Sequence, residues 1–212
     1  MSREFWDQWL TDTKGTERKI DVPFLKEILQ RAISTVLDVG SGRGSGVRTL
    51  AELGFSVTSV DSSLKAVHYL RQISQDSFIK SWNVVCADLL SLPFRDSSFG
   101  AVTSFNVMNF FIDESERERA FAELLRVVTP GGIILVIVLS AEDMGAKRGK
   151  PLGNGNVQLK SGMCLHHFTP TELEKMLKNT NIIELNCFQQ KDTFHDPPHT
   201  HAFVRALASH EG

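Results

Sequence analysis

The sequence of 212 residues contains few cysteines, little excess charge and no long apolar run. Cys86, Cys164 and Cys187 are odd in number and widely spaced, so they predict neither a disulfide framework nor a paired-cysteine metal site. The formal net charge of −2 excludes the general electrostatic footprint of a nucleic-acid-binding protein. The longest apolar run, Ile133–Leu139, is far below the roughly 20 residues that span a bilayer, and residues 1–10 lack the apolar core of a signal peptide. We therefore expect a soluble, cytoplasmic chain.

Hydrophobic residues make up 42% of the chain and charged residues 23%, which is enough apolar material for a buried core. The length argues for one domain over residues 1–212. Short β-branched and apolar runs alternate with helical patterns along the chain. The expected strands are 35–39, 56–60, 82–86, 101–105, 133–139, 182–188 and 202–207. This alternation predicts an α/β fold, a doubly wound, mostly parallel seven-stranded sheet with helices on both faces and an antiparallel edge strand.

Helical patterns occupy the segments between these runs. The first helix, which follows a cap at Asp21, has an apolar face formed by Val22, Leu25, Ile28, Leu29 and Ala32. The clearest helix, 114–128, carries an i, i+3, i+4, i+7 apolar stripe and directs residues 116–119 toward water. Residues 142–160 contain four glycines, three lysines and one arginine, which predict a long loop or an inserted excursion.

Three glycines alternate along the turn after the first strand, in the run Val-Leu-Asp-Val-Gly-Ser-Gly-Arg-Gly of residues 36–44. Gly40, Gly42 and Gly44 allow a tight turn and a close approach of the backbone to a ligand, and the helix start that follows favours an anionic group. Asp61 ends the next strand, where an acid can accept both hydroxyls of a ribose. A plain strand-to-helix turn would explain the glycines alone. The strand, glycine loop, helix, strand and acid together predict a nucleoside-cofactor site.

Two common nucleotide-binding patterns are not completed here. The dinucleotide pattern G-x-G-x-x-G lacks its third glycine whether the count begins at Gly40 or at Gly42, and no Gly-Lys-Ser/Thr follows for a P-loop. A nicotinamide cofactor and a nucleoside triphosphate are therefore the runners-up.

The chain resembles the class I S-adenosylmethionine-dependent methyltransferases, in particular their single-domain, small-molecule type. The matching segments are 36–44, 57–61, 87–89, 92–94, 98–99, 130–132 and 167–177, in family order and at family-like spacing. The resemblance implies a Rossmann-like fold, S-adenosylmethionine as the cofactor and methyl transfer as the activity.

The resemblance also implies which residues contact the methionine half of the cofactor. Gly40, Gly42 and Gly44 would wrap around it, and Asp38 would hold its amino group directly or through water. Asn106, just beyond the fourth strand, would lie near the sulfonium. A polar residue that is merely satisfied at a strand end is the alternative for Asn106.

The same resemblance assigns the adenosine half. Asp61 would bind the ribose, and Ser62 would lie beside the adenine edge. Asp88 would accept from the exocyclic amine while the Leu89 amide donates to a ring nitrogen, although Asp88 could instead cap a turn. The sequence departs from the family at Asn109, where a histidine is common, so any role of that histidine is absent.

The resemblance divides the chain into an N-terminal helical or lid segment (1–34), a cofactor-binding half (35–139) and an acceptor side with closing strands (140–212). We expect a small-molecule methyl acceptor as the partner, with neither a nucleic acid nor a membrane favoured. Two other classes stay open: a nicotinamide-dependent oxidoreductase, and a non-catalytic protein that binds S-adenosylmethionine.

Acceptor-binding groups should come from loops at the carboxyl ends of the strands. The candidates are the segment after Asn106, the excursion 142–167 and the aromatic stretch of Phe5, Trp6 and Trp9, which predicts a lid or a packing helix.

Histidines gather near the end of the chain. His166 and His167 precede a capped helix, while His195, His199 and His201 surround an Asp-Pro-Pro turn, and a strand would place His199 and His201 on one face. Such a set could bind a metal, supply a base near the acceptor or be structural. We expect no metal site and name no catalytic residue, with His166 and His167 as candidates that border the acceptor pocket.

Overall fold

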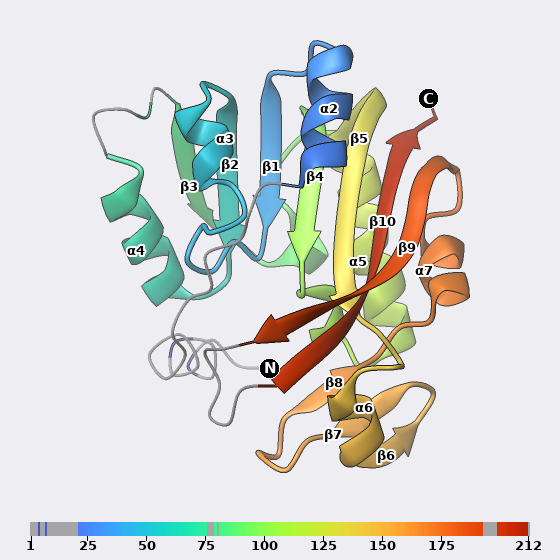
Figure 1. Ribbon diagram of the computed structural model, residues 1–212. Coiled ribbons are helices and arrows are strands. Elements are labelled where there is room, and N and C mark those ends of the chain that lie inside the picture. Colours follow the sequence, from blue (N-terminus) through green and yellow to red (C-terminus); the bar gives the residue numbers. More distant parts are fainter. Residues whose placement is uncertain are drawn as a thin grey trace.

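The computed structural model describes residues 4, 7, 21–75, 79, 81–192 and 199–211. Its centre is a seven-stranded sheet of order β3-β2-β1-β4-β5-β10-β9 (Figure 1). The strands are β1 (Thr35–Val39), β2 (Ser56–Asp61), β3 (Trp82–Cys86), β4 (Phe99–Phe105), β5 (Val128–Leu139), β9 (Thr180–Asp192) and β10 (His199–His210). The strands β1 to β5 pair in parallel, and β10 pairs antiparallel with both β5 and β9. The predicted α/β fold and its antiparallel pair at one edge are confirmed.

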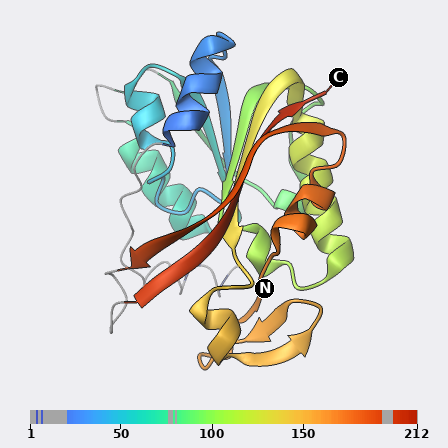
Figure 2. The ribbon, with the colours of Figure 1, turned by 45° about the vertical axis from the view of Figure 1, so that its right-hand side comes forward.

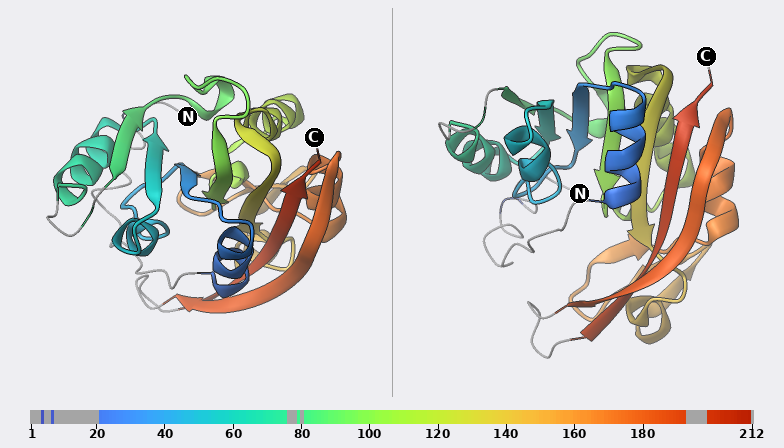
Figure 3. Two further views of the ribbon diagram at one scale, coloured as in Figure 1. Left: turned by 90° about the horizontal axis from the view of Figure 1, so that it is seen from above. Right: turned by 45° about the horizontal axis from the view of Figure 1, so that its top comes forward.

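Helices cover both faces of this sheet. They are α2 (Val22–Gln30), α3 (Arg48–Glu52), α4 (Leu64–Ile73), α5 (Glu114–Val127) and α7 (Pro170–Met176), whereas α6 (Met144–Arg148) lies beyond the end of the sheet (Figure 1). The short 3-10 turns are η1 (Leu89–Ser91) and η2 (Met108–Phe110). Seen from above, α2 and α3 lie on one side of the sheet and α5 and α7 on the other (Figure 3). Neighbouring residues of β1 face these two layers alternately: Val36 packs in the cluster with α2 and α3, and Leu37 packs in the cluster with α5 and α7.

The predicted face of the first helix is confirmed in part. Ile28 is buried and Leu25 packs against the same core cluster, as predicted, whereas Val22 and Leu29 are 69% and 61% exposed. Phe24, which was not predicted, is buried and lies four residues before Ile28 on the same side of the helix. Contact with the sheet therefore turns the helix toward Phe24 and Ile28.

The prediction that residues 116–119 face water is wrong for Arg117, which is buried at the start of α5. Its Nη1 donates to the carbonyls of Phe111 (2.9 Å) and Ile112 (3.0 Å). The guanidinium thus satisfies two carbonyls of the preceding loop, which is how a buried arginine avoids a large desolvation cost.

Residues 142–160 form an inserted excursion, one of the two alternatives that their composition predicted, and not a long loop. They form α6 and the strands β6 (Lys150–Gly153) and β7 (Asn156–Gln158). These two strands and β8 (Cys164–His166) make a small antiparallel sheet. Asn154 and Gly155 have φ values of 50° and 75° and make the turn between β6 and β7. The glycines therefore mark a hairpin turn. This small sheet lies beyond the end of the large sheet toward which β1 to β5 point (Figures 1 and 2).

A buried arginine joins β10 to the start of α2 and to the edge strand β9. Arg205 on β10 pairs with Asp21, the N-cap of α2, through two N–H groups at 2.6 Å each, and with Glu184 on β9 at 2.7 Å. The Arg205 side chain is 7% exposed and that of Asp21 is 14% exposed. Within the described ranges, no helix has the length and apolarity that a bilayer crossing requires.

Candidate functional site

The glycine loop after β1 is tightly packed at its ends and open in its middle. Gly40, Gly42 and Gly44 have φ values of 66°, 53° and 71°, which side chains rarely tolerate. A Cβ on Gly40 would overlap the Val107 side chain, and one on Gly44 would lie 3.0 Å from the ring of Trp82. A Cβ on Gly42 would meet no described atom within 4 Å. The middle of the loop therefore presents backbone to an open space.

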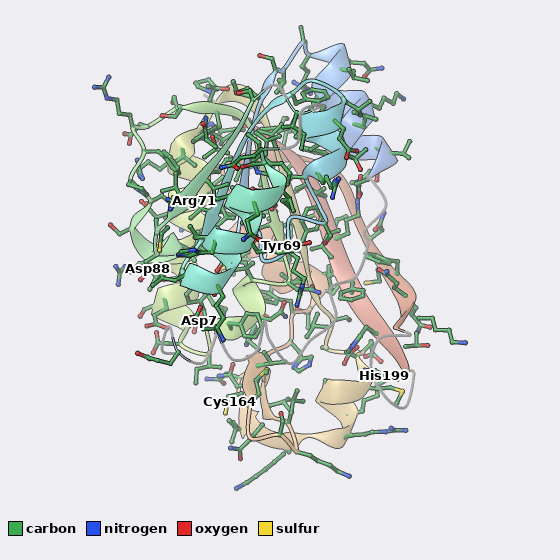
Figure 4. All side chains as sticks on the ribbon, turned by 90° about the vertical axis from the view of Figure 1, so that its left-hand side faces the viewer. Asp7, Tyr69, Arg71, Asp88, Cys164 and His199 are labelled. Atoms are coloured by element: carbon green, nitrogen blue, oxygen red, sulfur yellow. The ribbon has the colours of Figure 1, made fainter. Side chains whose placement is uncertain are left out.

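Asp61, at the end of β2, closes this space on one side. Its Oδ2 accepts from the Gly42 amide and its Oδ1 from the Ser63 amide, both at 2.9 Å. Burial raises the pKa of Asp61, the amide donors oppose that rise, and the carboxylate of Asp7 adds to it. Asp7 accepts from the Ser63 hydroxyl and from the Lys65 amide, so it lies against the start of α4 (Figure 4).

Two further predicted residues lie at the ends of β1 and β4. Asp38 is buried, and its Oδ1 accepts from the Thr103 hydroxyl at 2.6 Å. Asn106 has a φ of 56°, and its amide donates to the Ile137 carbonyl at 2.8 Å. The buried Asn106 Oδ1 accepts no hydrogen bond from any described group. Such an oxygen costs about 1–3 kcal/mol unless a donor reaches it, so it fits a site that a ligand completes.

The residues assigned to adenine follow β2 and β3. Asp88 is exposed (Figure 4), and its Oδ1 accepts from the Leu90 amide at 3.0 Å, so it caps η1. Leu89 is buried, and the Ser62 carbonyl lies 3.9 Å from the Cys86 sulfur. The turn-capping alternative for Asp88 is thus present, and a contact of Asp88 with adenine stays a prediction.

The structure brings these predicted residues together at the carboxyl ends of the adjacent strands β3, β2, β1 and β4. Asn109 adds a tie that the sequence reasoning missed. Its Oδ1 accepts from the Leu139 amide at 3.1 Å and its Nδ2 donates to the His166 carbonyl at 2.7 Å. The residue that departs from the family pattern therefore fixes the segment after β4 to the ends of β5 and β8.

His166 and His167 have different surroundings. The His166 ring is buried between Asn156 Oδ1, 2.9 Å from its Nδ1, and Glu172 Oε1, 2.8 Å from its Nε2. The His167 ring is also buried, but neither nitrogen makes a hydrogen bond with a described group. Burial lowers the pKa of His167, and the Asp143 carboxylate opposes this. His166 is thus a structural tie, and His167 is the member of the pair with unused polar atoms.

The later histidines lie at the start of β10. His199 and His201 share one face, as predicted, with their Nε2 atoms 3.0 Å apart. His201 Nδ1 lies 3.0 Å from Oδ2 of Asp143, a residue that the sequence reasoning did not single out. In the part of the chain that is described, no three His, Cys, Asp or Glu residues are arranged to hold a metal. His195 and the aromatic residues Phe5, Trp6 and Trp9 lie outside the described residues.

Comparison with known proteins finds similarity to methyltransferases. Residues 37–136 match the model of a methyltransferase domain. A demethylmenaquinone methyltransferase of Renibacterium salmoninarum is 35% identical over 114 residues, which cover 53% of this chain and 44% of the relative. A tRNA (carboxymethyluridine(34)-5-O)-methyltransferase of Arabidopsis thaliana is 34% identical over 109 residues, 51% of this chain and 25% of the relative. Each match thus covers less than half of the curated relative.

A solved structure extends the likeness to nearly the whole fold. A SAM-dependent methyltransferase of Methanosarcina mazei superimposes with a TM-score of 0.78 at 21% identity, covering 91% of this chain and 99% of the other. The arrangement at the carboxyl ends of β1, β2 and β4, the family match and this likeness agree. Residues 37–136, just under half of the chain, thus resemble a methyltransferase domain, and the fold of nearly the whole chain is similar to that of a SAM-dependent methyltransferase.

Proposed function

We propose that this chain transfers a methyl group from S-adenosylmethionine to a small-molecule acceptor by in-line displacement. The bound cofactor supplies an electrophilic methyl group on a sulfonium, so the protein has mainly to align the two reactants and exclude water. The observation that carries the proposal is the open side of Gly42 beside Asp61, with the Gly42 amide 2.9 Å from Asp61 Oδ2. Each carboxylate oxygen accepts more than one hydrogen bond, so Asp61 retains capacity for ribose hydroxyls.

The remaining contacts follow from where the side chains lie. We assign Gly40, Gly42 and Gly44 to the methionine half, with Asp38 at its amino group. Asn106 would direct its buried Oδ1 toward the region of the sulfonium. Asp61, Ser62, Asp88 and Leu89 would hold the adenosine half.

We assign the acceptor side to residues 140–212 and the cofactor half to residues 35–139, within one domain that begins with the 1–34 segment. A small molecule is favoured because the formal net charge is −2, whereas binding to a phosphate backbone requires lysine and arginine. Transfer to tRNA is the second candidate, since one matching relative is a tRNA methyltransferase.

The test begins with cofactor binding measured by calorimetry. S-Adenosylmethionine should bind, and Asp61→Asn should weaken binding at least tenfold, because loss of a charged acceptor costs about 1.5–3 kcal/mol. Asp96→Asn is the matched control, since the Asp96 side chain is 78% exposed and pairs with Arg126. Tight NAD binding without S-adenosylmethionine binding would refute the proposal and favour the oxidoreductase.

Turnover separates the remaining alternatives. Release of S-adenosylhomocysteine should be stimulated by members of a panel of hydroxyl, amine and thiol compounds, and not by bulk tRNA. Stimulation by tRNA alone would replace the small-molecule acceptor. Cofactor binding without turnover on either panel would favour the non-catalytic binding protein.

A further inference from the structure

The segment after β5 and the start of β10, which are distant in the sequence, bring a carboxylate and two imidazoles together. Asp143 follows β5 and caps α6, and its amide donates to the Ser140 carbonyl. The Ala202 amide of β10 donates to Asp143 Oδ2 at 2.8 Å, next to His201 Nδ1 at 3.0 Å. Figure 4 shows His199 at the end of the molecule that also carries α6. We call Asp143, His199 and His201 the Asp-His-His cluster.

The Asp143 carboxylate is ionised and fully engaged. Its side chain is 1% exposed, and burial by itself raises the pKa of a carboxyl. Hydrogen bonds from His201, Ala202 and Gly145 outweigh burial and hold the pKa of Asp143 below its usual value. Because a carboxylate only accepts, His201 must carry its proton on Nδ1 to donate to it. The carboxylate therefore fixes the tautomer of His201.

That tautomer determines what the second imidazole does. With Nδ1 protonated, the neutral His201 has only a lone pair on Nε2, and the Nε2 of His199 lies 3.0 Å from it. The short contact requires one proton between these two nitrogens. When the pair takes up one more proton, His201 becomes the imidazolium, donating to Asp143 on one side and to His199 on the other. The buried carboxylate then balances the new charge.

The Asp-His-His cluster lies on the side of the sheet that we assign to the acceptor. Asn109 fixes the segment after β4 to Leu139 and to the backbone of His166, and the next residue, His167, faces Gly145 and the Asp143 region. Open α/β sheets bind ligands outside the carboxyl ends of their strands. The cluster thus occupies the acceptor end of the sheet, next to the unsatisfied ring of His167.

We propose that the Asp-His-His cluster accepts the proton of the methyl acceptor and that the acceptor is therefore a hydroxyl compound, a phenol or an enol; this rests on the proposed methyl transfer. The O–H bond of the acceptor breaks and its proton joins the His199–His201 pair. The oxygen lone pair forms the new O–CH3 bond, and the electron pair of the broken S–CH3 bond stays on sulfur. Asp143 is a positioning residue, because it acts through His201.

The chemistry of acceptors explains this choice. A phenolic hydroxyl has a pKa of about 10, so at neutral pH almost all of it is protonated and weakly nucleophilic. A thiol supplies its own anion at nearly neutral pH, and a carboxylate needs no base at all. A positioned base typically contributes about 10²–10⁴-fold to rate. An imidazole pair held by a buried carboxylate therefore suits a hydroxyl acceptor, which must lose its proton to become a good nucleophile.

The first experiment reads the tautomer without an acceptor. Long-range ¹H–¹⁵N NMR of the ¹⁵N-histidine-labelled full chain should show His201 protonated on Nδ1 at neutral pH, and Asp143→Asn should remove this preference. His199→Gln, which leaves Asp143 in place, should keep it, as should the exposed control His68→Gln. An Nε2-protonated His201 in the unmodified protein would overturn the proposal. Stoichiometric zinc in protein purified without a histidine tag would also overturn it, because the two Nε2 atoms would then be metal ligands.

The second experiment uses paired acceptors. Methylation of a simple phenol should fall by about 10²-fold or more in His201→Gln. A nitrophenol that is already ionised at the assay pH should lose much less, and His68→Gln should change neither rate.

The outcomes separate this proposal from the proposed function. Equal losses on the phenol and the nitrophenol, or transfer confined to amines and thiols, would overturn the hydroxyl assignment while methyl transfer itself stands. Failure of S-adenosylmethionine to bind, with the His201 tautomer as expected, would instead refute the proposed function. Calorimetry should show unchanged cofactor affinity in His201→Gln and His199→Gln.

Discussion

Gly42→Ala tests whether the open side of the glycine loop is where the cofactor lies. Gly42 has a φ of 53°, and its added methyl group would meet no described atom within 4 Å. Gly131, in the irregular first part of β5, has a φ of 73° and is equally open. An L-residue in this conformation costs about 1–2 kcal/mol, and reduced freedom of the unfolded chain returns about 0.4–1 kcal/mol. Both alanine variants should therefore lose about 1 kcal/mol, or about 2–4 °C in Tm for a chain of this size.

Added cofactor should separate the two variants. At a concentration of about 100 times its Kd, a ligand that binds only the folded state stabilises it by about 2.7 kcal/mol. Gly131→Ala should recover this in full, as measured by thermal denaturation with and without S-adenosylmethionine. Gly42→Ala should bind the cofactor at least tenfold more weakly, since its methyl group would occupy the space next to the loop. Equal affinities in the two variants would refute the assignment of the loop to the cofactor.

Two further predictions concern stability. Arg205→Met should lower the free energy of unfolding by about 3–5 kcal/mol in urea denaturation, because it leaves the largely buried Asp21 carboxylate without its cation. Arg48→Met, at a surface pair whose side chains are 46% and 44% exposed, should cost less than about 1 kcal/mol. Similar losses in the two variants would contradict the structural role of Arg205. Burial lowers the pKa of His167, so the unfolded chain takes up a proton near pH 6.5 that the folded chain does not take up until lower pH. The free energy of unfolding should therefore fall as pH drops below about 6.5, by less in His167→Gln, and parallel pH curves for the two proteins would count against the burial of a neutral ring.

The sequence alone determined the large sheet and the core of the candidate site. The segments 35–39, 56–60 and 82–86 are short and rich in β-branched and apolar residues, which is a local signal that needs no tertiary information. Glycines at alternate positions and an acid at the next strand end are local features as well. Because both follow strands that are parallel in one sheet, Gly42 and Asp61 were predictable neighbours, and the hydrogen bond between them follows from adjacent strands.

Only the tertiary structure decided which helix side chains are buried. Helical spacing placed Ile28 on one face with Val22 and Leu29, whereas contact with the sheet buries Ile28 together with Phe24. Arg117 is charged in sequence and buried in the fold, where carbonyls of the loop before α5 accept from it.

Asp143, in the segment after β5, is the clearest case of a contact that the sequence could not predict. Asp143 and His201 are 58 residues apart in sequence, and nothing in the composition around Asp143 distinguishes it from an ordinary N-cap. Their contact depends on the register of β10 against β5, which pairs Phe203 with Leu139. Residue periodicity fixes which side chains share a face within one strand, as it did for His199 and His201. It contains no information on which residue of a distant segment that face meets, because a shift of register exchanges the partners without changing the pattern within either strand.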